Sequence, residues 1–106
     1  AKIPNAWADA IGKAEPEDTL VSRAFSGRLG RSIQTRYVMA ATAKDTPEPA
    51  PYPIQRNLTK AMRDDAVKKN NIDGIQAWAG QSAKLASPIS AEQIVINLWE
   101  GAQKLF

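Results

Sequence analysis

The basic side chains that follow the first acidic turn are the first candidates for chemistry. Residues 19–44 contain five Lys or Arg residues and no Asp or Glu. Arg28 and Arg31 are three residues apart, so on a helix they would lie on one face and could clamp a phosphate beside Gly27. The alternative is that these arginines pair with the acid-rich turn at residues 15–18 or with a partner surface, and we favour it. The surrounding SGRLG sequence matches neither a Walker loop nor a dinucleotide fingerprint.

A second candidate is the sequence WAGQS at residues 78–82. An indole, a glycine that permits close approach, an amide and a hydroxyl could line a site for a flat aromatic ligand or a small polar substrate. The competing interpretation is a packed helix kink, which the residue types alone favour. Tyr52 lies between two prolines, and this arrangement either displays the ring rigidly or forms a turn.

The residue types that are missing restrict the function further. The chain has 106 residues and contains neither histidine nor cysteine. Disulfide frameworks, cysteine-ligated metal sites and catalysis by Ser-His-Asp or Cys-His groups are therefore excluded, which argues against an enzyme made only of this chain. Adjacent Asp64 and Asp65 would point about 100° apart on a helix, so no metal site is expected.

Charge and hydropathy set the expected surroundings of the chain. The formal net charge of +3 is too small to indicate a nucleic acid or an anionic membrane as a partner. No stretch is long and apolar enough to span a membrane, and residues 1–20 lack the features of a signal peptide. We therefore expect a cytoplasmic protein.

Hydrophobic spacing predicts the elements that must position these residues: a mainly α chain, of the α+β class with at most one or two short strands. The strand candidate covers residues 19–25, and it would need a partner strand. Ser26 or Gly27 would then cap the next helix. The predicted helices cover residues 6–14 (capped by Asn5), 29–43, 54–70 and 91–105, with a weaker helical period over 72–85 and an extended, proline-rich connector over 44–53. The helix over 54–70 should end near Asn70, because an asparagine side chain favours a left-handed stop.

The last predicted helix has the clearest boundary and the widest apolar sector. Ser90, with Gln93 three residues on, forms a capping-box sequence. Two neighbouring apolar stripes follow, so that this helix needs to be covered from two directions. The residues of the two stripes are Ile94, Leu98, Gly101 and Leu105, and Val95, Trp99, Ala102 and Phe106.

Three stretches, in order along the chain, match sequence motifs of one enzyme family. The first is DTLVSRAFSGRLGRSI at residues 18–33. The second consists of PYPIQ at 51–55 and WAGQSAKL at 78–85, and the third is SAEQIV at 90–95. Together they resemble the C-terminal third of nitronate monooxygenases, formerly called 2-nitropropane dioxygenases, with the motifs in the family's order.

The resemblance implies an FMN-dependent (β/α)8-barrel enzyme, of which this chain is the second domain plus closing helix. Residues 1–50 would form the strand-helix part of that domain. Residues 51–106 would form the helical part, whose last helix returns to the barrel. The missing N-terminal barrel would hold the flavin and the family's catalytic histidine, so we expect no catalytic residue, bound cofactor or turnover in this segment alone.

The resemblance also implies roles for individual residues. The loop at residues 78–82 would face the flavin and nitronate pocket, and the connector tyrosine would approach the same cavity. These flavin- and substrate-proximal residues are Trp78, Gly80, Gln81, Ser82 and Tyr52. The residues that would organise the second domain, contact a neighbouring loop or bind phosphate are Ser26, Gly27, Arg28 and Arg31.

The whole enzyme would oxidise small alkyl nitronates with O2, and this segment would cover the pocket. Without the barrel, this segment is expected to form a homodimer through its last helix or to remain partly molten. One alternative is a freestanding helical interaction module without catalysis, with the last helix as its partner surface. Another is the same part of a related flavin enoyl reductase.

Overall fold

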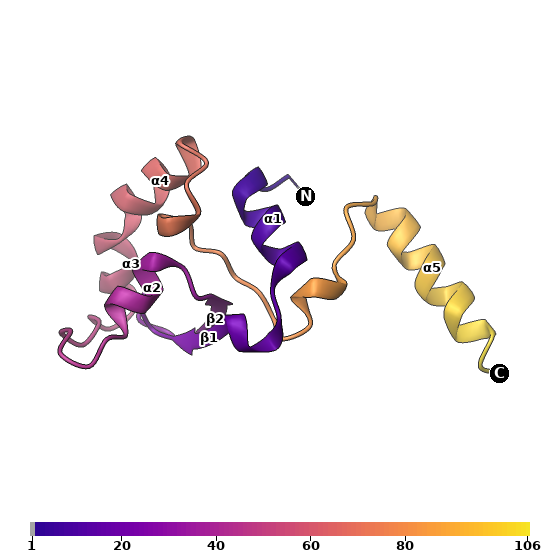
Figure 1. Cartoon of the computed structure of the whole chain (residues 1–106), viewed down its shortest axis with the longest axis horizontal. Coiled ribbons are helices and arrows are strands. Elements are labelled where there is room, and N and C mark those ends of the chain that lie inside the picture. Colours follow the sequence, from indigo (N-terminus) through magenta and orange to yellow (C-terminus); the bar gives the residue numbers. More distant parts are fainter. Residues whose placement is uncertain (1) are drawn as a thin grey trace.

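The structure, a computed structural model, describes residues 2–106. Figure 1 shows a small body of short elements and one helix set apart from it. The helices of the body are α1 (Asn5–Lys13), α2 (Arg36–Ala41), α3 (Ile54–Leu58) and α4 (Lys60–Lys68). The strands are β1 (Thr19–Ser22) and β2 (Gly30–Ile33), the 3-10 helices are η1 (Pro16–Asp18), η2 (Ile72–Gly74) and η3 (Ala83–Leu85), and the separate helix is α5 (Ala91–Gln103).

The centre of the body is an antiparallel hairpin. Strand β1 pairs with β2 in the register Thr19 with Ile33 and Ser22 with Gly30. The predicted helix over residues 29–43 is therefore wrong in its first half, because Gly30–Ile33 supplies the partner strand that β1 needs. Helix α2 begins only after Thr35, whose side-chain oxygen accepts a hydrogen bond from the Val38 N–H at 3.3 Å.

The hairpin also binds the segment that was predicted to continue a helix over residues 72–85. After η2 the chain is extended, and Ser32 forms an isolated antiparallel bridge with Trp78. The Ile33 N–H donates to the Ala77 carbonyl at 2.9 Å. Pairing with the free edge of β2 satisfies backbone groups in a segment that Gly74 and Gly80 make a poor helix.

The buried core lies between the hairpin, α2 and this extended segment. Phe25, Val38 and Ile75 are its largest fully buried apolar side chains. The Phe25 ring lies 5.1 Å from the Tyr37 ring and meets the Trp78 ring edge-on at 6.0 Å, measured between centroids. These contacts tie the hairpin turn to segments from both halves of the sequence.

The helix predicted over residues 54–70 is interrupted. It breaks at Thr59 into α3 and α4, and it ends as predicted at a left-handed residue, Asn70, with a φ of 52°. The first helix forms almost where it was predicted, but Asn5 lies within it and does not cap it. The Asn70 side-chain oxygen instead accepts the Ala6 N–H at 2.8 Å, which joins the start of α1 to the end of α4.

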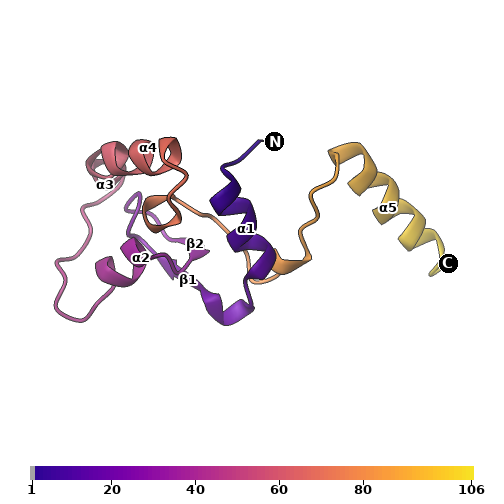
Figure 2. The ribbon, with the colours of Figure 1, turned by 45° about the horizontal axis from the view of Figure 1, so that its top comes forward.

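Helix α5 stands away from the body in both ribbon views (Figures 1 and 2), at the end of an extended segment. Its predicted cap is confirmed, since the Ser90 side-chain oxygen accepts the Gln93 N–H at 3.2 Å. Every residue of α5 is exposed except Ala102, which is half-buried. The radius of gyration is 16.0 Å, above the value of about 13 Å for a compact chain of this length.

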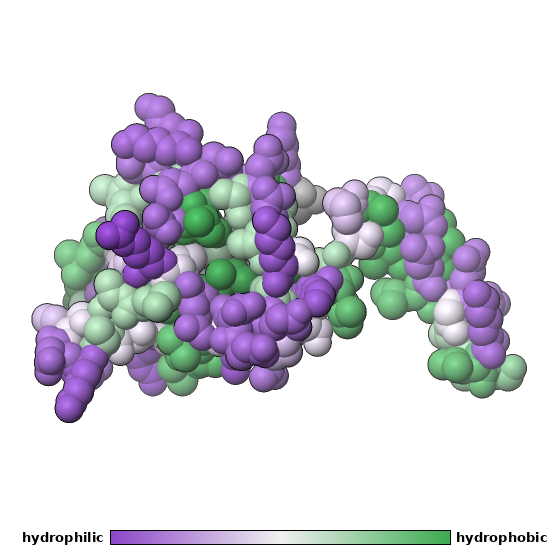
Figure 3. All heavy atoms as spheres, in the orientation of Figure 1, coloured by the Kyte–Doolittle hydropathy of each residue, from purple (hydrophilic) through white to green (hydrophobic). Residues whose placement is uncertain are grey.

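The apolar side chains of α5 are therefore uncovered. Hydrophobic atoms run beside a hydrophilic stripe along this helix in Figure 3. Trp99 is 60% exposed, and the side chain of Phe106 just beyond the helix is 96% exposed. The wide apolar sector predicted from the sequence forms, and the rest of the described chain, from residue 2 onward, leaves it exposed.

Candidate functional site

The two aromatic residues singled out in the sequence contact neighbouring parts of the hairpin, one at its turn and the other at the start of β2. Tyr52 lies against Gly27 and Arg28, at the end of the turn, and Trp78 lies against Gly30, where β2 begins. Residues 27 and 30 are three apart, so their Cα atoms lie within about 11 Å of each other. The fold thus brings the PYPIQ and WAGQS sequences together on the FSGRLG sequence.

Trp78 is held from several sides. A methyl group at Gly30 would lie 2.5 Å from Cζ3 of the Trp78 ring, so the indole lies directly on the strand backbone. The Trp7 indole N–H donates to the Trp78 carbonyl at 3.2 Å. The next N–H, of Ala79, donates to the Arg31 carbonyl at 3.1 Å. A third of the Trp78 side chain remains exposed, so that this fixed ring still presents a surface.

Tyr52 is fixed by contacts of a different kind. The Arg28 guanidinium lies over the Tyr52 ring, 4.0 Å from its centroid. This distance is typical of a cation–π interaction. The backbone of the connector, from Ala50 to Tyr52, lies directly on Gly27. Tyr52 is 42% exposed, so its ring is also presented outward.

The other residues of the WAGQS sequence form an exposed turn. Gly80, Gln81 and Ser82 are all exposed, and a methyl group at Gly80 would meet nothing within 4 Å. The turn closes through backbone bonds, from the Ala83 N–H to the Gly80 carbonyl at 3.2 Å. The predicted helix kink is wrong, because Trp78 lies in an extended segment and Gly80 in a turn. The side chains of Gln81 and Ser82 are therefore accessible on this turn.

The basic residues take no part in a phosphate clamp on one helix. Arg28 lies in a turn and Arg31 in β2. Arg31 donates to the Thr19 hydroxyl at 3.0 Å, and Ser26 accepts the Arg28 N–H at 3.2 Å to close the turn. The favoured pairing of these arginines with the acidic turn is also absent: the ion pairs among residues 2–106 are Lys60–Asp64, Lys69–Asp65 and Lys84–Glu15.

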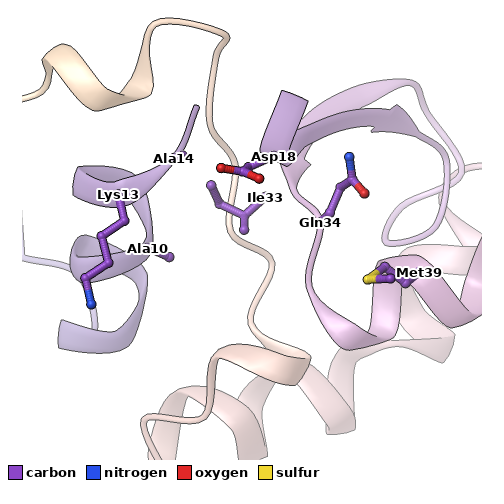
Figure 4. Close-up of a pocket in the computed structure, with 7 residues that line it drawn as sticks. All are labelled: Ala10, Lys13, Ala14, Asp18, Ile33, Gln34 and Met39. Atoms are coloured by element: carbon purple, nitrogen blue, oxygen red, sulfur yellow. The ribbon is translucent and has the colours of Figure 1, made fainter. Parts of the chain in front are cut away.

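A cavity of about 330 Å³ lies apart from these residues (Figure 4). Two of its polar side chains are already engaged: Asp18 accepts the Glu15 N–H at 2.9 Å, and the Gln34 amide donates to the Glu17 carbonyl at 2.8 Å. None of the predicted site residues lines it. Its lining residues are Ala10, Lys13, Ala14, Asp18, Ile33, Gln34 and Met39.

The residues that sequence reasoning missed are those that support the two rings. Gln55 donates to the Ala24 carbonyl at 2.8 Å and accepts the Ala50 N–H at 3.0 Å. Tyr37 also donates to the Ala24 carbonyl, at 2.8 Å. Burial raises the pKa of the Tyr37 phenol, and the side-chain bond from Gln55 partly offsets that increase. The position of Gln55 in the PYPIQ sequence was the available signal for this role.

The described residues could cover one side of a cofactor site, but they could not form the whole site. They offer two fixed aromatic surfaces, an amide and a hydroxyl, but the hairpin turn is not the start of a helix that could cradle a phosphate. No group of three potential metal ligands is found among residues 2–106. The same residues contain no helix long and apolar enough to cross a membrane.

Sequence comparison finds similarity to one family of proteins. The family model described as nitronate monooxygenase matches residues 1–101. A probable nitronate monooxygenase of Staphylococcus aureus (strain Newman) is 37% identical over 92 residues, which are 85% of this chain and 25% of that protein. The corresponding protein of strain MSSA476 is 38% identical over the same length.

A solved structure supports the fold. The nitroalkane oxidase from Streptomyces ansochromogenes is similar to this chain with a TM-score of 0.79 and 28% sequence identity. The similarity covers 97% of this chain and 30% of that one. This chain therefore spans about a quarter of the length of the curated relatives it matches and under a third of the solved neighbour. By its sequence and its fold, the chain belongs to the nitronate monooxygenase family.

Proposed function

We propose that this chain is the second domain and closing helix of an FMN-dependent oxidoreductase that oxidises small alkyl nitronates with O2. Trp78, held on the start of β2, and Tyr52, held on the adjoining turn of the hairpin, carry the proposal. In a pocket formed jointly with a barrel, they would supply rigid aromatic walls. The turn at residues 80–82 would supply an amide and a hydroxyl beside them.

The chemistry of these side chains suits a small anion next to a flat ring system. A nitronate carries its negative charge on the two oxygens of its nitro group, so donors that point at those oxygens stabilise its binding. The Gln81 amide and the Ser82 hydroxyl are both donors. Bound FMN would supply the electron transfer from the nitronate to O2, while Trp78 and Tyr52 would exclude water from the bound substrate.

Helix α5 would be the contact with the rest of the enzyme. Its uncovered apolar side chains, which include Val95 and Trp99 at 65% and 60% exposure, form a surface of the kind that packs against another part of a protein. We assign residues 1–50 to the strand-helix part of the second domain and 51–106 to the helical part that ends in this contact.

The Gln81→Ala variant of the full-length enzyme tests the pocket assignment. Loss of one hydrogen bond to a charged substrate corresponds to about a 10- to 100-fold decrease in kcat/KM for a nitronate. The matched control is Gln34→Ala, because the Gln34 amide donates to the Glu17 and Thr19 carbonyls, in η1 and β1, and not to the turn at residues 80–82. Unchanged kcat/KM in Gln81→Ala would remove the pocket role of this turn.

A freestanding interaction module is the less favoured alternative: the apolar side chains of α5 are exposed, but the similarity to nitronate monooxygenases extends over residues 1–101. The two functions differ in a direct readout. A pocket-covering domain changes nitronate turnover when Trp78 or Gln81 is substituted, whereas an interaction module loses partner binding when Trp99 is substituted and has no turnover to lose.

A further inference from the structure

The connector backbone lies directly on Gly27. That glycine has a φ of 91°, in the left-handed region that side chains disfavour. A Cβ atom there would lie 2.7 Å from the Ala50 carbonyl oxygen and 2.8 Å from the Pro51 carbonyl carbon. Both the conformation and the space therefore require glycine. The result is that the residues just before Tyr52 have one fixed position on the hairpin turn.

The amide of Gln55 holds the same connector from its other side. Its oxygen accepts the Ala50 N–H at 3.0 Å, and its nitrogen donates to the Ala24 carbonyl at 2.8 Å. The nitrogen also lies 3.5 Å from the Tyr37 hydroxyl oxygen. One side chain thus links the connector to the hairpin turn, three residues after Tyr52.

The guanidinium of Arg28 fixes the ring itself. It lies 4.0 Å from the centroid of Tyr52, and among residues 2–106 Arg28 takes part in no ion pair. A planar guanidinium stacks on an aromatic ring in a way that an ammonium group does not reproduce. Its main interaction within the described chain is therefore the contact with the tyrosine.

We propose that Gly27, Arg28 and Gln55 are positioning residues that hold the Tyr52 ring at the nitronate pocket. Gly27 fixes the backbone before the tyrosine, Arg28 fixes the ring, and Gln55 fixes the connector. The inference rests on the proposed function, which assigns Tyr52 to that pocket. The FSGR and PYPIQ sequences then share one role, because they supply the two sides of the contact between the hairpin turn and the connector. Arg28 orients the Tyr52 ring, and it affects the substrate only through that ring.

The test is a double-substitution cycle in the full-length enzyme, with kcat/KM measured for an alkyl nitronate. Gln55→Ala is expected to lower kcat/KM about tenfold or more, because small displacements of a positioned group are costly. In a Tyr52→Ala background, the same substitution is expected to have almost no further effect. Gln34→Ala serves as the matched control and should leave kcat/KM unchanged in both backgrounds.

Arg28→Met gives an independent arm at an exposed position, where unfolding is not a concern. We expect a two- to fivefold loss, about the value of an exposed cation–π contact, and again no loss in the Tyr52→Ala background. Arg28→Lys should recover only part of the loss. A ring-current shift of the Arg28 side-chain protons, measured by NMR in the full-length enzyme, should weaken in Gln55→Ala and be absent in Tyr52→Ala.

The outcomes separate this inference from the proposed function. If Tyr52→Ala turns over nitronate like the parent enzyme, the pocket role of Tyr52 is wrong and nothing remains for these residues to position. If Tyr52→Ala is impaired but Gln55→Ala and Arg28→Met reduce kcat/KM by the same factors in both backgrounds, the pocket assignment stands and the positioning role is overturned.

Discussion

Single side chains hold distant parts of this small body together by donating hydrogen bonds to backbone carbonyls. Thr59 is buried and donates to the Phe25 carbonyl at 2.7 Å, across 34 positions of sequence. The Arg63 side chain donates in turn to the Thr59 hydroxyl at 3.1 Å. Such bonds compensate for an apolar core that contains few large side chains.

Replacement of Thr59 by valine should therefore destabilise the chain. The substitution keeps the shape but leaves the buried Phe25 carbonyl without its donor, which costs about 1–3 kcal/mol in the free energy of unfolding. Denaturant titration measures the change. The matched control is Thr46→Val, because the Thr46 hydroxyl makes the same kind of bond, to the Ala40 carbonyl at 2.7 Å, in an exposed place. An equal loss in both variants would contradict this account.

Tyr37 should make stability fall at alkaline pH. Burial raises the pKa of its phenol above the ordinary value of 10.0, so the folded state holds the proton more tightly than the unfolded state does. The stability present below pH 10 is then lost as the pH rises through the raised pKa. Denaturant titrations at about pH 8 and about pH 11 should show that the free energy of unfolding falls less between these two pH values in Tyr37→Phe than in the parent chain. Equal losses would refute this role.

At the scale of elements, glycine positions decide where the chain can turn. Gly27 has a positive φ and no space for a Cβ atom, whereas Gly12 lies within α1 and would meet nothing within 4 Å. Gly27→Ala should lower the free energy of unfolding by more than about 1 kcal/mol. Gly12→Ala should raise it by about 0.5–1 kcal/mol through helix propensity. Thermal denaturation of both variants tests the contrast, and similar midpoints would count against it.

The long-range cap of α1 gives a second test at this scale. Asn70 combines a left-handed backbone with a side chain that accepts the Ala6 N–H at 2.8 Å. Asn70→Gly keeps the backbone conformation but removes the cap, which should cost about 1 kcal/mol. Asn70→Asp keeps the acceptor and should cost less. Chemical denaturation measures both variants. An unchanged free energy of unfolding in Asn70→Gly would show that the contact contributes nothing to stability.

Most helices and the strand β1 could be predicted from local sequence, and the partner of β1 could not. The cap at Ser90 and the left-handed stop at Asn70 are local signals, and both form as predicted. Residues 30–33 carry a helical period, but pairing with β1 and with residues 77–79 overrides it. The candidate rings were found from residue types and family resemblance, whereas their supports, Gln55 and Trp7, depend on contacts far apart in sequence.

The whole molecule is a small body with an uncovered helix attached to it. Ile94 and Ile96 are each 39% exposed and Leu98 is 69% exposed, so α5 presents apolar surface on more than one side. In the full-length enzyme this surface should be buried against the barrel. Hydrogen exchange of α5 is expected to be fast in the isolated chain and markedly slower in the full-length enzyme. Equally fast exchange in both would show that the helix has no such contact.

Oxygen consumption by the flavin-loaded full-length protein tests the central claim most directly. We predict O2 uptake that depends on an added alkyl nitronate, with kcat/KM lowered about tenfold or more by Trp78→Ala, because that substitution removes one wall of the pocket. An enzyme that consumes no O2 with alkyl nitronates and instead reduces an enoyl thioester would contradict the account. So would nitronate turnover that is unaffected by Trp78→Ala.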